Sequence, residues 1–178
     1  MKDGTIGLLK GDRQKSADRA IMEITGSEYT HARIYILGFT IESTVWMARG
    51  RLFPRSGVLL TLGKRKSDAY FEPKVDRTPE QARAGLEKAI ELVNSRAWYA
   101  YLLTFLDFIL YPTRALWRWI YKKTGWAPFV SSRTNCSYLA DLLEKEMGLD
   151  LWPDMPESLT VPGDYPYCKQ LVQTGWQD

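Results

Sequence analysis

Two adjacent segments of alternating, β-branched residues constrain the fold of this chain more than any other feature. Residues 31–37 (HARIYIL) and 40–46 (TIESTVW) alternate in character along their length, which is typical of half-buried strands. Gly38 breaks the pattern between them, and a short turn that contains glycine can join two antiparallel strands. We therefore predict an antiparallel β-hairpin over residues 31–46.

Three shorter segments have the composition of further strands, and one helix is predicted before the hairpin. The strand segments are residues 6–9, 58–62 and 69–75. Residues 16–24 place alanine and isoleucine at helical spacing, with Ser16 as the predicted N-cap and Gly26 after the end.

A capping box gives the strongest local helix signal in the chain. Thr78 is the predicted N-cap, Pro79 takes the first helical position, and Gln81 completes the box. The helix is predicted to run to about Asn94. Its predicted apolar face consists of Ala82, Leu86, Ala89, Ile90 and Val93.

Helices follow in the C-terminal half. Residues 98–121 predict one or two helices interrupted near Pro112, and residues 135–147 predict another, ended by Gly148. The tail from Leu151 is predicted to be mostly loop, because it holds four prolines. Strands followed by helices favour an α+β fold with an antiparallel sheet packed against helices. The length favours a single domain over residues 1–178.

Charge and composition exclude several classes of protein. The 24 basic and 21 acidic residues are too evenly balanced to indicate binding to nucleic acid. One histidine and two cysteines are too few for a disulfide-rich secreted domain, or for a zinc site without help from carboxylates. Because no segment shows metal-ligand spacing, we expect no metal. We also expect no other cofactor, since none of the functions considered below needs one.

The N-terminal residues lack the basic and apolar segments of a secretory signal. Residues 98–111 form the most apolar stretch, which is shorter than the roughly 20 residues that span a bilayer. We therefore expect a cytoplasmic protein.

Cys136 is the residue best placed for chemistry, because it lies where the helix over residues 135–147 begins. The free N–H groups and partial positive charge at a helix N-terminus favour the thiolate. The same N–H groups could bind the oxyanion of a tetrahedral intermediate. The alternative is a small buried apolar residue, as most free cysteines are. Cys168 lies in a proline-bounded loop, and we interpret it as structural.

His31 is the only histidine in the chain, and it begins the first strand of the hairpin. If Cys136 is a nucleophile, His31 is the side chain whose pKa suits its activation. Glu42 lies on the second strand, where it could stand beside His31 and orient the ring, as the third member of a triad does. The alternatives are a surface or hydrogen-bonded core histidine and a glutamate that faces solvent.

The segment Arg114–Trp126 mixes three tryptophans with four basic residues. Basic amphipathic helices rich in tryptophan can lie on membrane surfaces, so peripheral membrane contact is one interpretation. The other is a helix that packs its aromatic side on the domain while its lysines and arginines remain solvated.

These features together resemble the NlpC-type cysteine peptidase superfamily, in its circularly permuted YaeF/YiiX-like branch. In that branch the histidine precedes the cysteine, as His31 precedes Cys136. Lecithin:retinol acyltransferase-like proteins share that order and an Asn-Cys motif. The segments that carry the resemblance are GTIGLLK (4–10), SADRAIMEITGSEYTHARIYI (16–36), Ile41-Glu42-Ser43, the helix from Thr78, Trp98-Tyr99-Ala100-Tyr101, Asn135-Cys136-Ser137 and Pro162-Gly163-Asp164.

The resemblance implies a papain-like core with Cys136 as nucleophile, His31 as base and Glu42 as the residue that orients the base. It implies a hydrolase that cleaves an amide or peptide bond through a thioester acyl-enzyme, with a peptide or peptidoglycan fragment as substrate. One alternative is acyl transfer or ester hydrolysis on a lipid-linked acyl substrate, and another is a non-catalytic binding module. Tyr29 is a candidate side-chain donor to the oxyanion.

Overall fold

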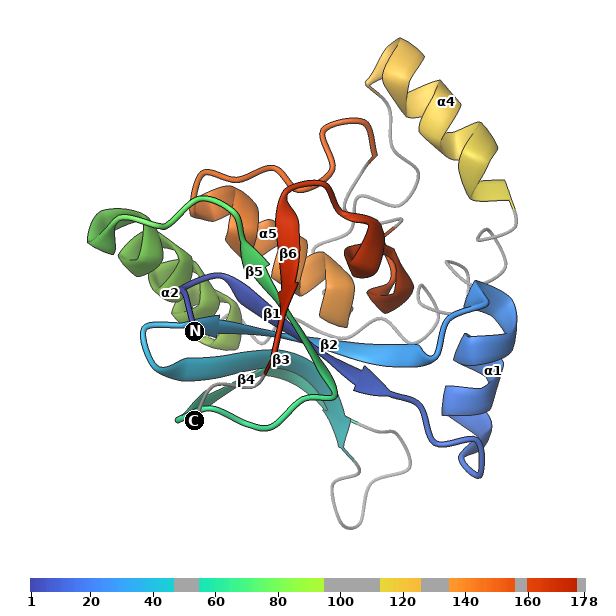
Figure 1. Ribbon diagram of the computed structural model, residues 1–178, viewed down its shortest axis with the longest axis horizontal. Helices are drawn as coiled ribbons and strands as arrows, with labels where there is room; N and C mark the ends of the chain where they lie inside the picture. The colour runs from blue at the N-terminus through green and yellow to red at the C-terminus, as the bar shows by residue number, and fades with distance from the viewer. Residues whose placement is uncertain (47–54, 95–112, 126–134, 156–159, 176–178) are drawn as a thin grey trace.

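One antiparallel sheet organises the molecule. The computed structural model describes residues 1–46, 55–94, 113–125, 135–155 and 160–175. Within them, the strands pair in the order β4-β3-β2-β1-β5-β6 (Figure 1). The strands are β1 (Thr5–Lys10), β2 (Tyr29–Ile36), β3 (Phe39–Trp46), β4 (Arg55–Leu62), β5 (Ala69–Pro73) and β6 (Leu171–Thr174).

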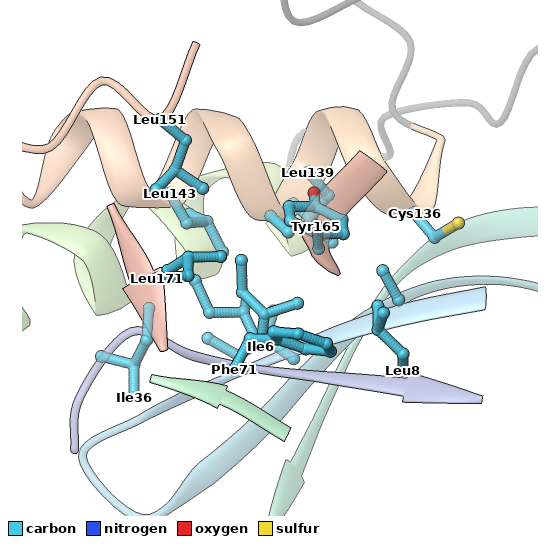
Figure 2. Packing of buried hydrophobic residues seen from close by; sticks show 14 of the residues in the cluster. Ile6, Leu8, Ile36, Phe71, Cys136, Leu139, Leu143, Leu151, Tyr165 and Leu171 are labelled. Carbon is cyan, nitrogen blue, oxygen red and sulfur yellow. The ribbon is translucent and has the colours of Figure 1, made fainter. Parts of the chain in front are cut away.

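The helices α2 (Pro79–Asn94) and α5 (Cys136–Glu146) pack against this sheet, so the predicted α+β class is confirmed. The other helices are α1 (Ser16–Thr25), α4 (Arg114–Thr124) and the 3-10 helix η3 (Pro162–Tyr167). α5 packs against β2 and β3, while α2 packs against β4. Figure 2 shows the core between α5 and the sheet, where Leu139 and Leu143 lie above Ile6 and Phe71.

The predicted hairpin is confirmed as β2 and β3, joined by a two-residue turn. Leu37 and Gly38 both have positive φ, at 47° and 80°, as the turns that match the twist of paired strands require. Ile34 pairs with Ile41 and faces the core. Since side chains alternate along a strand, Arg33 and Glu42 lie on the opposite face of the sheet.

The hairpin does not stay paired along its length, and this shapes the site described below. β2 and β3 pair only over residues 34–36 and 39–41. β3 instead pairs with β4 from Phe39 to Trp46. The two strands therefore separate beyond Ile34, and the edge of β2 that carries Ala32 is open there.

The capping box of α2 is confirmed, but part of its predicted apolar face is wrong. The Thr78 N–H donates to Gln81 Oε1 over 3.0 Å, and the Gln81 N–H donates to Thr78 Oγ1 over 3.3 Å. The helix buries Ala82, Gly85 and Ala89, whereas Ile90 and Val93 are exposed. The reason is a close approach at Gly85, where a Cβ atom would lie 2.7 Å from Met147 Cγ.

The boundaries of α1 and α5 test three predicted caps. Ser16 is the first residue of α1 and Lys15 occupies its N-cap, so the prediction for Ser16 is wrong by one position. Gly26 ends α1 in the left-handed conformation, as predicted. Gly148 likewise has a positive φ of 86° beyond α5.

The C-terminal tail is more ordered than predicted. β6 adds a strand beside β5, with Leu171 opposite Pro73, and η3 precedes it. Residues 95–112, which include the predicted helix from Trp98 and its break near Pro112, lie outside the described residues. Of the helices that the structure describes, none has the length and apolar character needed to cross a membrane.

A buried ion pair connects the segment just before α2 to the C-terminal part of α5. The Arg77 guanidinium donates to Glu144 Oε2, and both side chains are almost fully buried. Burial raises the pKa of Glu144 to about 7, although Arg77 opposes the rise. Gly4 lies directly against this carboxylate, because a Cβ on Gly4 would be 2.3 Å from Glu144 Oε1.

We predict that Gly4→Ala destabilises the fold much more than Gly63→Ala. The two glycines have nearly equal φ, 87° and 92°, but a Cβ on Gly63 would meet nothing within 4 Å. Gly63→Ala should cost about 1 kcal/mol of unfolding free energy, from backbone strain alone. Gly4→Ala should cost about 3 kcal/mol, because the buried carboxylate must also shift. Urea unfolding measures both, and equal losses would contradict the contact with Glu144.

Candidate active site

Cys136 is the first residue of α5, and the sequence around it explains why the helix starts there. Asn135 is the N-cap, and its side-chain oxygen accepts from the Tyr138 N–H over 2.7 Å. The Asn135 carbonyl accepts from the Leu139 N–H. The N–H groups of Cys136 and Ser137 belong to the same first turn and take no part in these two bonds. In Figure 2 the Cys136 sulfur points away from the labelled core side chains.

The sulfur lies at the open edge of β2, where β3 has separated. Ala32 and Ile34 are two residues apart, so their N–H groups point toward the same edge of the strand. The Ile34 N–H faces β3, whereas the Ala32 N–H donates to the Cys136 sulfur. The gap in the hairpin therefore holds the thiol and gives it a main-chain donor.

His31 precedes Ala32 and contacts the same sulfur. Its ring is hydrogen-bonded to the Cys136 side chain. On its other side, His31 Nε2 lies 3.0 Å from Glu42 Oε2. Because Nε2 is occupied by Glu42, Nδ1 is the ring nitrogen left to exchange a proton with sulfur. The structure thus brings Cys136, His31 and Glu42 together in that order.

The electrostatics of this trio favour a thiolate beside an imidazolium. Burial raises the pKa of Cys136, but the hydrogen bond and charge of His31, followed by the Ala32 N–H, outweigh burial and lower it. Burial lowers the pKa of His31, but its bonds to Cys136 and Glu42 outweigh this and raise the pKa to about 9. At neutral pH the proton therefore resides on His31.

Glu42 is held by two arginines as well as by His31. Arg33 Nε donates to Glu42 Oε2 over 2.7 Å, and Arg65 donates to Oε1. Burial of Glu42 raises its pKa, but the hydrogen bonds and charges of His31 and Arg33 outweigh burial and lower it to about 2. Glu42 is 4% exposed, so the interpretation of Glu42 as a solvent-facing strand residue is wrong.

Arg33 and Arg65 are parts of the site that the sequence analysis missed. Arg33 lies two residues after His31 on the same face of β2, so the alternation of the strand could have indicated it. Arg65 comes from the loop between β4 and β5. The conformation of this loop places Arg65 beside Glu42, and no local sequence pattern predicts that contact.

Tyr165 of η3 contacts the first turns of α5, and no local pattern in the sequence indicated this role. Its hydroxyl lies 3.0 Å from the Ser137 carbonyl oxygen and 2.9 Å from Asp141 Oδ1. Burial, and then the charge of Asp141, raise the pKa of Tyr165 well above its ordinary range. The hydroxyl therefore remains a donor and fixes the turn that follows Cys136 (Figure 2).

Cys168 and Tyr29, the two remaining residues that the sequence analysis considered, lie in surroundings unlike those of Cys136. Cys168 is buried, and its thiol donates to the Leu151 carbonyl over 3.6 Å. Burial raises the pKa of Cys168, the opposite direction to Cys136. The Tyr29 hydroxyl interacts with Glu28 and Lys10, and this environment offers no support for Tyr29 as an oxyanion donor.

Comparison with known proteins leaves the family open. Neither a scan against models of protein families nor a search of curated proteins finds a match to this chain. Within the described part of the chain, no three His, Cys, Asp or Glu side chains gather as a metal ion would require. The arrangement around Cys136 is therefore interpreted from its own geometry: a buried thiol, a base, a carboxylate and main-chain donors.

We predict that iodoacetamide alkylates Cys136 much faster than Cys168 at neutral pH. The reason is the opposite direction of the two pKa shifts, since the thiolate is the reactive form. His31→Ala should slow the alkylation of Cys136 about tenfold or more, because its pKa returns toward that of an ordinary thiol. Peptide mapping by mass spectrometry separates the two cysteines. Equal rates in the wild-type protein would contradict the ion pair.

We also predict that Arg65→Gln moves the pH profile of Cys136 alkylation upward by about half a pH unit. Loss of a positive charge beside Glu42 favours the protonated forms of both Cys136 and His31, so both limbs of the profile shift in the same direction. Lys64→Gln is the matched control, with the same charge change on an exposed neighbour. A profile that keeps its position and loses only amplitude would mean that Arg65 acts through folding alone.

Proposed function

We propose that this protein is a cysteine hydrolase that cleaves an amide or peptide bond through a thioester acyl-enzyme. The observation that carries the proposal is the chain of contacts from the Cys136 thiol through the His31 ring to Glu42, whose carboxylate lies 3.0 Å from Nε2. Nucleophile, base and orienting carboxylate within hydrogen-bond reach are the geometric signature of nucleophilic catalysis.

In the proposed reaction, the Cys136 thiolate attacks the carbonyl carbon of the substrate. The N–H groups of Cys136 and Ser137 stabilise the oxyanion that forms on the carbonyl oxygen. The imidazolium of His31 then gives its proton to the leaving amine, the C–N bond breaks, and a thioester remains on sulfur. Water attacks the thioester, His31 takes its proton, and the carboxylic acid leaves as the thiolate is regenerated.

The fold is consistent with the proposed family, a circularly permuted NlpC-type peptidase with a papain-like core. An antiparallel sheet carries His31 and Glu42, and a helix packed on that sheet begins at Cys136. The order in the chain, histidine before cysteine, agrees with the permuted branch. We infer a peptide or peptidoglycan fragment as the substrate from that resemblance.

The charges around the nucleophile support an acidic peptide. The cations His31, Arg33 and Arg65 outnumber the two anions, Cys136 thiolate and Glu42, in this cluster. A locally positive site attracts substrates that carry carboxylates. Peptides of bacterial cell walls commonly carry such groups, so muropeptides are the first substrates to test.

A second candidate is acyl transfer or ester hydrolysis on a lipid-linked substrate, of the lecithin:retinol acyltransferase-like type. The observation that favours it is on α4, where Leu116 and Trp119 are exposed beside basic residues. Both reactions would use the same thioester, so they differ in the leaving group and not in the catalytic residues.

The deciding experiment incubates the protein separately with muropeptides and with phospholipid vesicles. We expect cleavage of muropeptides and an acyl adduct on Cys136, detected by mass spectrometry after acid quenching. Cys136→Ala should reduce turnover by about a thousandfold or more, while Cys168→Ala, the matched control, retains it. Turnover of phospholipid alone would favour the second candidate. Absence of turnover and adduct with both substrates would favour a non-catalytic module.

The rate of the catalysed reaction should depend on pH in a defined direction. Catalysis requires the thiolate of Cys136 together with the protonated His31 that serves the leaving group. The pKa of His31 is raised to about 9, so kcat/KM should fall as the pH rises through about 9. It should stay high at neutral pH, because the pKa of Cys136 is lowered. A maximum in mildly acidic solution with loss by neutral pH would contradict this.

A further inference from the structure

α4 presents apolar and basic side chains together on its exposed side. Leu116 is 54% exposed and Trp119 is 59% exposed. Leu116, Trp119 and Lys123 are spaced by three and four residues, so they share one face of the helix. The interpretation in which α4 packs its whole aromatic side on the domain is therefore wrong for Trp119. Trp126 lies outside the described residues.

The opposite side of α4 is less exposed. Trp117, Ile120 and Tyr121 are partly buried, and Trp117 Nε1 donates to Thr113 Oγ1 over 3.1 Å. The C-terminal end is anchored by an ion pair between Lys122 Nζ and Asp154 Oδ2 at 2.9 Å. The exposed residues Leu116, Trp119 and Lys123 thus lie on one side of a helix whose other side is partly buried.

The charge of α4 is of one sign. Between residues 114 and 125 there are four basic residues, Arg114, Arg118, Lys122 and Lys123, and no acidic one. In Figure 1, α4 projects from the body of the molecule, on the side where α5 begins. A surface that approaches this side would meet the exposed face of α4 early.

We infer that α4 is an interfacial helix that binds an anionic lipid surface. Such a surface has negative headgroups for Lys123 on this face and for the exposed Arg118 at its flank, and an apolar layer beneath them for Trp119 and Leu116. The lysine stem can lie along apolar groups while its ammonium reaches the headgroups. A nucleic acid would match the cations but offer no apolar layer for Leu116, so lipid is the better match. This inference is independent of the chemistry at Cys136.

The binding should be reversible and sensitive to salt. Two exposed apolar side chains on an 11-residue helix supply a limited apolar area. Much of the attraction therefore comes from the basic residues, each of which is worth about fivefold in affinity near an anionic surface. Raising the salt concentration to about 1 M shortens the Debye length to about 3 Å and should release most of the protein.

The test is co-sedimentation of the full chain with vesicles, either pure phosphatidylcholine or a mixture with phosphatidylglycerol. We expect binding to the mixed vesicles and little to the neutral ones. Arg118→Glu with Lys123→Glu should weaken binding by about 25-fold or more. Its matched control is Arg19→Glu with Lys74→Glu, which makes the same charge change at exposed positions on α1 and after β5 and should change affinity much less.

A second pair of variants tests the apolar contribution. Trp119→Ala should weaken binding about tenfold, whereas Leu62→Ala, at an exposed apolar residue of β4, should leave it unchanged. Because the three α4 positions and the three control positions are exposed, circular dichroism should show folded variants. Absence of binding to mixed vesicles would overturn the inference. So would equal losses in the α4 and control variants, or binding to a dissolved polyanion without binding to vesicles.

Discussion

The separation of β2 from β3 is the constraint on which the candidate site depends. A main-chain N–H at an open strand edge must find an acceptor, because leaving it buried and unpaired is costly. At Ala32 that acceptor is the Cys136 sulfur. The break in the hairpin therefore makes room for the thiol and provides an N–H donor that stabilises the thiolate. If the two strands stayed paired past Ile34, β3 would occupy the edge and the start of α5 would have no place beside His31.

The charges around Glu42 bear on the stability of a thiolate at a largely buried position. Burial opposes ionisation of Cys136, and the hydrogen bond and charge of His31 together with the Ala32 N–H outweigh it. Arg33 and Arg65 neutralise Glu42 from its other sides. The carboxylate can then orient His31 without adding unopposed negative charge near the sulfur. Tyr165 adds rigidity, since it fixes the Ser137 carbonyl in the turn after the nucleophile.

The parts that sequence predicted correctly are those governed by local spacing. The hairpin follows from alternation, and the start of α2 follows from the pairing of Thr78 with Gln81. From sequence alone, Glu42 could either contact His31 or face solvent. The pairing of β2 with β3 places it beside His31. The positions of Arg65, Tyr165 and β6 depend on the conformation of loops and of the C-terminal tail. No local sequence pattern predicts that conformation. The face of α2 was misjudged because Gly85 allows an approach that buries small residues in place of Ile90.

The wide separation of the site residues along the chain has a consequence for the newly made polypeptide. His31 and Glu42 leave the ribosome about a hundred residues before Cys136, and η3, which braces α5, comes later still. Until these distant segments assemble, the sulfur has neither its imidazole nor its amide donor and behaves as an unactivated thiol. Cys136 therefore becomes a reactive thiolate only when the tertiary structure is complete. In an unfinished or misfolded chain its thiol would have the low reactivity of an ordinary cysteine.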